Sequence, residues 1–88
     1  MHAVVVNVTI TEDSEATEAE LREQVVPRVS QAPGFVAGYW TRKDNSGLSM
    51  TVWDSEDAAT AASEMVRSSM PAGVTLDNVE VREVVANA

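Results

Sequence analysis

Asn7 is the polar side chain with the clearest chemical use in this chain, because it interrupts a run of valines from Val4 to Val8. A buried amide without a hydrogen-bond partner costs roughly 1–3 kcal/mol. In such a place the amide can donate to a substrate carbonyl or to an oxyanion that develops during a reaction. Neighbouring backbone or water can satisfy the same amide, as happens for most buried polar groups. Asn7 is therefore a candidate catalytic residue with a structural alternative.

The aromatic side chains are the second group of candidates, because all of them fall between positions 35 and 53. Trp53 can form a wall against which a flat molecule stacks, and its indole N–H can donate a hydrogen bond. A core or dimer-interface position is the alternative for Trp53. Tyr39 and Trp40 are adjacent in an expected strand, so they point to opposite faces and at most one of them lines any given pocket. Tyr39, Trp40 and Trp53 are candidate substrate-binding residues.

The remaining titratable side chains give no recognisable catalytic or metal-binding set. The chain has one histidine and no cysteine. That histidine, His2, lies at the terminus, where disorder is common, and one imidazole does not make a metal site or a catalytic triad. Arg42 and Lys43 are adjacent cations that either steer an anionic substrate or belong to a solvated turn. We therefore expect no metal and no bound cofactor.

The first half of the chain predicts a strand followed by a helix. Residues 3–10 are rich in β-branched side chains, which favour an extended chain, and both faces of this strand are largely apolar. A helix is expected to start near Ser14 and to close at residues 32–34, with a buried stripe that repeats every four residues. Pro27 lies inside this helix and predicts a kink or an early end. The stripe consists of Leu21, Val25 and Val29.

The second half predicts a hairpin, a helix and a final strand. Strands are expected over residues 35–42 and 48–53, with turn-forming residues 43–47 between them. An acidic, capped helix follows from residue 54. The chain then ends with residues 74–76 and 79–85, which predict a final strand with partial alternation. Ala58 and Ala62 give the second helix a small face. This face allows either a close approach to the sheet or a pocket beside Trp53 and Asn7.

The order strand–helix–strand–strand–helix–strand predicts a ferredoxin-like α+β fold. Two right-handed strand–helix–strand units place both helices on one face of a four-stranded antiparallel sheet. The opposite face would then expose apolar strand residues, which marks an interaction surface. We expect residues 1–88 to form a single domain that dimerises sheet to sheet as a barrel.

Charge and hydropathy restrict the partners and the location. The formal net charge is −8, so nucleic acid and anionic membranes are not expected partners. No apolar run reaches the ~20 residues that a bilayer-spanning helix needs. The N-terminal residues lack the basic leader and cleavage site of a signal peptide. A cytoplasmic location is therefore expected.

Three stretches of the sequence resemble the antibiotic biosynthesis monooxygenase-like family of the dimeric α+β barrel superfamily. They are Val4-Val5-Val6-Asn7-Val8, Pro33-Gly34-Phe35-x-x-Gly38-Tyr39 and Trp53-x-Ser55-Glu56-x-Ala58. The resemblance implies a cleft between the sheet and the helices of each subunit, with Asn7 at the place of an asparagine that often lines it. Some members of the family oxidise phenolic or quinol-like molecules with molecular oxygen and without metal or flavin. Others bind and degrade haem.

The sequence departs from the haem-degrading branch at two places. That branch uses a tryptophan and an axial histidine on the second helix. Here Ala62 stands at the place of the tryptophan, and residues 54–70 contain no histidine. The departures argue against haem as substrate, and they leave an oxygenase without an obvious base. Ala62 becomes a further candidate lining residue of the cleft.

Two hypotheses follow from the sequence. The chain resembles a small cofactor-independent monooxygenase, a homodimer that acts on an aromatic or quinol-like small molecule. Asn7 would then polarise a substrate oxygen, and Trp53 would stack on the flat ring. The alternative is a non-catalytic dimeric module that binds a small apolar ligand or has a structural role.

Overall fold

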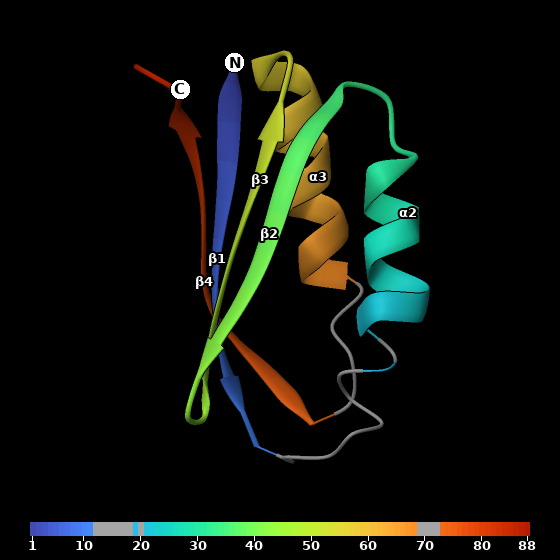
Figure 1. The fold of residues 1–88 in the computed structure, drawn as a ribbon, viewed down its shortest axis with the longest axis vertical. Helices are drawn as coiled ribbons and strands as arrows, with labels where there is room; N and C mark the ends of the chain where they lie inside the picture. Colours follow the sequence, from blue (N-terminus) through green and yellow to red (C-terminus); the bar gives the residue numbers. More distant parts are fainter. Residues whose placement is uncertain (12–18, 20, 69–72) are drawn as a thin grey trace.

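A computed structural model describes residues 1–11, 19, 21–68 and 73–88 and contains a four-stranded antiparallel sheet in the order β2-β3-β1-β4. The helices lie together on one face of this sheet (Figure 1). This arrangement confirms the ferredoxin-like α+β fold that the sequence predicts. The elements are β1 (His2–Ile10), η1 (Leu21–Val25), α2 (Val26–Ser30), β2 (Phe35–Lys43), β3 (Ser46–Trp53), α3 (Glu56–Ser68) and β4 (Val74–Glu83).

The pairing register assigns each strand residue to one of two faces, because side chains alternate along a strand and directly paired residues share a face. We call the side that carries the helices the covered face and the other side the open face. The covered face includes Val4, Val6, Val8, Trp40, Thr51, Trp53, Leu76 and Val79. The open face includes Ala3, Val5, Asn7, Tyr39, Leu48, Met50, Val52, Asn78, Glu80 and Arg82.

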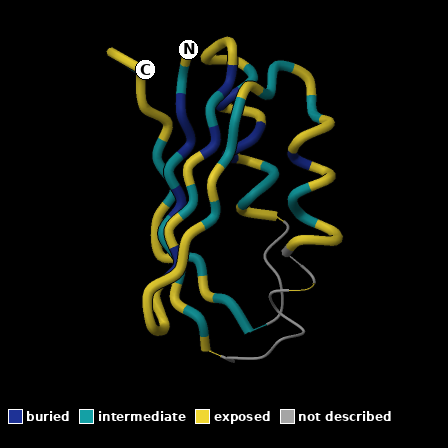
Figure 2. The backbone as a smooth tube through the Cα atoms, in the orientation of Figure 1, coloured by how far each residue is buried: buried dark blue, intermediate teal, exposed yellow. Residues whose placement is uncertain are grey.

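The hydrophobic core lies between the covered face and the helices. Figure 2 shows buried segments in the middle of the sheet and on the sides of the helices that face it. Trp53 is the largest fully buried side chain, with 1% of its surface exposed. A buried tryptophan removes roughly 150–250 Å² from water, which is worth about 4–6 kcal/mol at ~25 cal/mol per Å². The core consists of Val4, Val6, Val29, Trp53, Ala59 and Ala62.

The hairpin between β2 and β3 is tighter than the sequence predicts. Only Asp44 and Asn45 lie outside the two strands, and Lys43 pairs with Ser46. Asp44 has a φ of 54°, a left-handed conformation that aspartate tolerates better than most residues. The expected five-residue turn is therefore wrong at both ends, since Lys43, Ser46 and Gly47 are strand residues.

Pro27 does not end the first helix, which continues to Ser30. Proline has no N–H, so the carbonyl of Glu23 loses the donor that an α-helix would provide. The π-helical turn η1 precedes α2 directly and includes Glu23. The expectation that the helix ends early at Pro27 is therefore wrong. Instead, the helix has a wider, π-helical turn just before the proline. The helix start expected near Ser14 lies outside the described residues.

A bulge interrupts the alternation of β4. Asn7 pairs with Asn78, but its neighbour Val8 pairs with Leu76, so the register skips Asp77. The hydroxyl of Thr9 donates to the Asp77 carboxylate at 2.6 Å. The extra residue puts both Leu76 and Val79 on the covered face, which explains the imperfect alternation in the sequence.

β4 ends at Glu83, two residues before the expected end. Across the described residues, no helix is both long and apolar enough to cross a membrane.

Candidate functional site

The stretch around Gly34 and the stretch after Trp53 meet in the structure. The carbonyl of Gly34 accepts the Asp54 N–H at 2.9 Å. A Cβ at Gly34 would lie 2.6 Å from Asp54 Oδ1 and 2.9 Å from Ala58 Cβ, and Gly34 has a φ of 87°. Both the backbone conformation and the lack of space require glycine here. This contact fixes the start of β2 against the start of α3.

Trp53 is a core residue whose polar atom already has a partner. Its ring packs against Phe35 in a T-shaped arrangement, with ring centroids 5.5 Å apart. Its indole N–H donates to the buried hydroxyl of Thr51 at 2.9 Å. With 1% of its surface exposed, Trp53 offers almost no area on which a ligand could stack in this structure.

Ala62 belongs to the same packed region. It is 5% exposed, and its neighbour Ala59 is completely buried. Both alanines join Trp53 and Val4 in one hydrophobic cluster. Ala59 and Ala62 are therefore core residues where α3 packs on the sheet.

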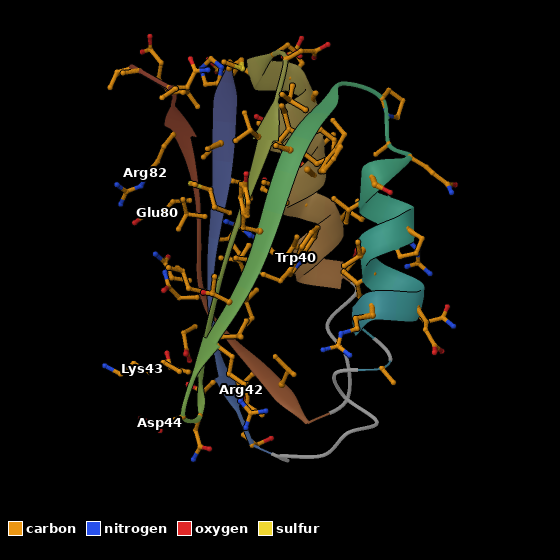
Figure 3. All side chains as sticks on the ribbon, viewed as in Figure 1. Trp40, Arg42, Lys43, Asp44, Glu80 and Arg82 are labelled. Carbon is orange, nitrogen blue, oxygen red and sulfur yellow. The ribbon has the colours of Figure 1, made fainter. Side chains whose placement is uncertain are left out.

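Trp40 is the other tryptophan of the covered face, and it is only half-buried. Its indole lies beside Gly38, because a Cβ at Gly38 would stand 2.9 Å from Trp40 Cη2 and 3.3 Å from Phe35 Cε1. Figure 3 shows Trp40 between β2 and α3. Trp40 is therefore an aromatic surface of the covered face that the core does not completely enclose.

Asn7 and Tyr39 lie on the open face, away from the helices. Asn7 is half-buried and pairs with Leu48 and Asn78. Tyr39 pairs with Met50 and is 64% exposed. Tyr39 and Trp40 thus point to opposite faces, as the sequence predicts.

The sheet separates the candidate residues into two groups. Trp40, Trp53 and Ala62 belong to the covered side, whereas Asn7 and Tyr39 belong to the open side. A single pocket beside both Asn7 and Trp53 is therefore incompatible with the register, because a strand presents neighbouring residues to opposite faces.

The open face carries a polar cluster on β4. Arg82 Nε donates to Glu80 Oε2 at 2.7 Å, and Asn78 donates to Glu80 Oε1 at 3.1 Å. The Arg82 Nη2 atom also contacts Glu80 Oε2. The hydrogen bond from Arg82, followed by that from Asn78 and the charge of Arg82, lowers the pKa of Glu80 below its usual range.

His2 is the first residue of β1, where it pairs with Trp53. Its Nε2 lies 3.5 Å from Glu56 Oε2 at the start of α3. Its Nδ1 is buried and has no hydrogen-bond partner among the residues that the structure describes. The sequence signal for this placement is the alternation His2, Val4, Val6 along one face of β1. Within the described ranges, no group of three or more His, Cys, Asp or Glu residues is arranged to hold a metal.

Arg42 is the last residue of the strand expected over residues 35–42, and it lies in β2. Its Nε donates to the Asp44 carbonyl at 2.9 Å. Alternation from Trp40 places Arg42 on the covered face, whereas Lys43 belongs to the open face. Figure 3 shows the two cations on opposite sides of the β2 ribbon.

Comparisons with known proteins agree with this fold. The model of the antibiotic biosynthesis monooxygenase family matches residues 1–66. Among curated proteins, none matches the sequence. A Deinococcus radiodurans protein assigned to the antibiotic biosynthesis monooxygenases has a similar structure, with a TM-score of 0.62 and 16% identity over 100% of this chain and 96% of that one.

The haem degrader MhuD from Mycobacterium tuberculosis has a TM-score of 0.49 and 18% identity, with 98% of each chain covered. At 16% identity the Deinococcus radiodurans structure supports only the fold, whereas the family model covers most of the sequence. This chain belongs to the antibiotic biosynthesis monooxygenase family.

Proposed function

We propose that this protein is a cofactor-independent monooxygenase that acts on an aromatic or quinol-like small molecule. Family membership over residues 1–66 supports an oxygenase. The observation that carries the choice of substrate class is the half-buried indole of Trp40 on the covered face. A flat apolar ring gains by packing against such a surface.

The proposed reaction draws its electrons from the substrate. A phenol with an unsubstituted para position and O₂ would give a para-quinone and water. One oxygen atom joins the ring carbon, the other leaves in the water, and the phenol supplies all four electrons. The protein's share is to hold the ring, to favour the electron-rich anion and to limit water around it. Trp40 would provide the first of these three contributions.

Oxygen consumption tests this proposal. We expect substrate-dependent O₂ uptake, proportional to protein concentration and insensitive to chelator, with at least one member of a panel of phenols and hydroquinones. Trp40→Leu should reduce the uptake by about 2- to 10-fold, since an aromatic pair is worth roughly 0.5–1.5 kcal/mol beyond the apolar area that leucine keeps. Tyr39→Leu is the matched control, because it removes an aromatic ring from the adjacent position on the opposite face. Absence of uptake across the panel would reject the enzyme.

Asn7 has a structural rather than a catalytic role in this proposal. Its amide lies on the open face between Leu48 and Asn78, so we propose that it contributes to assembly rather than to polarising the substrate. Asn7→Ala should then alter dimer stability and leave kcat nearly unchanged in the remaining dimer. Loss of turnover in an intact Asn7→Ala dimer would instead return Asn7 to the catalytic role that the sequence suggests.

We propose that the protein is a homodimer whose open faces pack together. Large apolar side chains are exposed on this face, among them Tyr39 at 64%, Leu48 at 45% and Met50 at 42%. An apolar patch of this kind on a small domain marks an interaction surface, and a twofold axis lets one patch cover its copy. Light scattering after size exclusion should give twice the monomer mass at micromolar concentration; a monomer mass would contradict the proposal.

A non-catalytic module remains the second candidate function, because one observation favours it. Trp53 and Ala59 are almost completely buried in the core, which limits the surface that a ligand beside α3 could contact. If the module hypothesis holds, flat aromatic molecules will bind at most weakly and no substrate in the panel will consume oxygen.

A further inference from the structure

The open face is uneven in height across its four strands. On β2 and β3 it carries large exposed side chains, among them Tyr39 at 64% and Met50 at 42%. Tyr39 pairs with Met50, and Met50 pairs with the half-buried Val5 of β1. Val5 pairs in turn with Glu80, which ends this row on β4. One half of the open face therefore protrudes, whereas the other half is lower and ends in a polar edge.

Two copies of this face can pack about a twofold axis between the sheets in two ways that keep the strands aligned. An axis along the strands sets β3 on the partner's β1 and β2 on the partner's β4. An axis across the strands sets each strand on its own copy. The second way would press protruding halves together and leave a gap over β1, where packing contacts are lost. The relief of the open face therefore favours the axis along the strands.

The pairing register makes this arrangement specific, because an axis along the strands keeps each row of paired residues over the same row of the partner. The second row of the open face consists of Ala37, Val52, Ala3 and Arg82. In both rows a large side chain meets a smaller one. The opposed pairs, in which the second residue belongs to the partner, are Met50 on Val5, Val52 on Ala3, Tyr39 on Glu80 and Arg82 on Ala37.

We propose that the two copies pack about a twofold axis along the strands, so that the Tyr39 hydroxyl of each copy donates a hydrogen bond to the partner's Glu80. The Glu80 carboxylate accepts from Arg82 Nε at 2.7 Å and from Asn78 at 3.1 Å. A carboxylate has about four lone-pair sites, so it can accept a further donor. This inference rests on the proposed homodimer and specifies its orientation and its polar contact.

The polar cluster of Asn78, Glu80 and Arg82 explains why a second copy of this chain fits the open face better than an apolar partner does. Figure 3 shows Glu80 and Arg82 on the side of β4 that points away from the helices. An apolar surface over this edge would remove water from the carboxylate without a replacement donor, which is costly. The Tyr39 hydroxyl supplies that donor, and a hydrogen bond to an ionised acceptor is stronger than one between neutral groups. The contact therefore selects for self-association.

A double-mutant cycle on the dimer tests the contact. Within one copy Tyr39 and Glu80 lie on opposite edges of the sheet, three strand spacings or about 14 Å apart, so coupling between them reports a contact between copies. Tyr39→Phe should raise the dimer Kd in sedimentation roughly 10-fold or more, as expected for loss of a hydrogen bond to a charged group. Glu80→Gln should raise it in the same direction, and the double variant should add at most about 2-fold to the larger single effect.

Glu83→Gln is the matched control, since it removes the same charge from β4 on the covered face, where Glu83 pairs with His2. It should leave the dimer Kd within about 2-fold and show no coupling with Tyr39→Phe. Independent effects of Tyr39→Phe and Glu80→Gln, which multiply in the double variant, would overturn the contact. An unchanged Kd in both single variants, with their thermal unfolding intact, would overturn it too.

The same measurements separate this inference from the proposed homodimer. A wild type that sediments as a monomer at micromolar concentration would reject the homodimer and the contact together. A wild-type dimer that Met50→Lys dissociates, but in which Tyr39 and Glu80 are not coupled, would support the homodimer and reject the axis along the strands.

Discussion

The ring of Phe35 meets the indole of Trp53 edge to face, with centroids 5.5 Å apart and an interplanar angle of 82°. This contact joins the first residue of β2 to the last residue of β3, immediately before α3 begins. Gly34 and Asp54 add a backbone hydrogen bond at the same place. The junction therefore orients α3 over the sheet, and its weakening should be visible in the stability of the whole domain.

The Trp53–Thr51 hydrogen bond should make a measurable contribution to stability. Thr51→Val keeps the side-chain size but leaves the buried indole N–H without its acceptor, at 2.9 Å in the native protein. We expect the free energy of unfolding in urea to fall by about 1–3 kcal/mol. Thr41→Val is the control, because the exposed Thr41 hydroxyl donates to the Leu48 carbonyl and should matter by less than about 0.5 kcal/mol. Equal losses of unfolding free energy in the two variants would show that the buried hydrogen bond contributes no more than the exposed one.

Gly34→Ala should destabilise the domain more than Gly47→Ala does. The new Cβ would approach Asp54 and Ala58 within 3 Å, at a φ of 87°. Left-handed strain and overpacking each cost about 1–3 kcal/mol. Gly47→Ala provides the comparison, since its Cβ would also overlap one atom, Val8 Cγ2 at 2.6 Å, but lacks the second overlap and the left-handed φ of Gly34. Denaturant midpoints should rank wild type first, Gly47→Ala second and Gly34→Ala last; the reverse order of the two variants would contradict this account.

Met50→Lys should weaken the proposed dimer. The side chain lies on the open face and is 42% exposed, so dimerisation would bury an unpaired ammonium group. We expect a Kd at least about 30-fold higher, which corresponds to ~2 kcal/mol. Thr60→Lys places the same charge on an exposed position of α3 and should leave sedimentation unchanged. If both variants sediment like wild type, the open face is not the dimer interface.

Glu80 should give the stability a defined pH dependence. Arg82 and Asn78 lower its pKa in the folded protein, so its stabilising effect is present above the unfolded-state pKa of about 4.3. The effect is lost as the pH falls through the lower folded value. Between pH 5 and pH 3, wild type should therefore lose more stability than Glu80→Gln. Parallel curves for wild type and Glu80→Gln would contradict the prediction.

Alternation in the sequence was sufficient to predict the sheet and its two faces. The opposite directions of Tyr39 and Trp40 and the split between Met50 and Trp53 follow directly from it. The sequence could not choose between alternatives that depend on distances across the core. Whether Ala62 borders a pocket or a close contact depends on how near α3 comes to Trp53, and no local pattern encodes that distance.

The candidate site was harder to predict because it combined residues from different faces. Alternation already separated Asn7 from Val6, but the face of Asn7 relative to Trp53 depends on the β1–β3 register, in which Trp53 pairs with His2. Lys43 was harder to place than Arg42, because the sequence predicts Arg42 in the strand and Lys43 in the turn. A turn of two residues instead of five makes Lys43 a strand residue with a fixed direction on the open face.

The strand order also has a consequence for the newly made chain. β2 and β3 are joined by two residues, so they can pair locally, on the ~1–10 μs scale of hairpins. β1 is made first, yet its partners include Glu83 near the other end of the chain. At ~5–20 residues per second of synthesis, this valine-rich strand waits several seconds for its second neighbour. During this interval one edge of β1 has no partner, and an unpaired strand edge can pair with another chain.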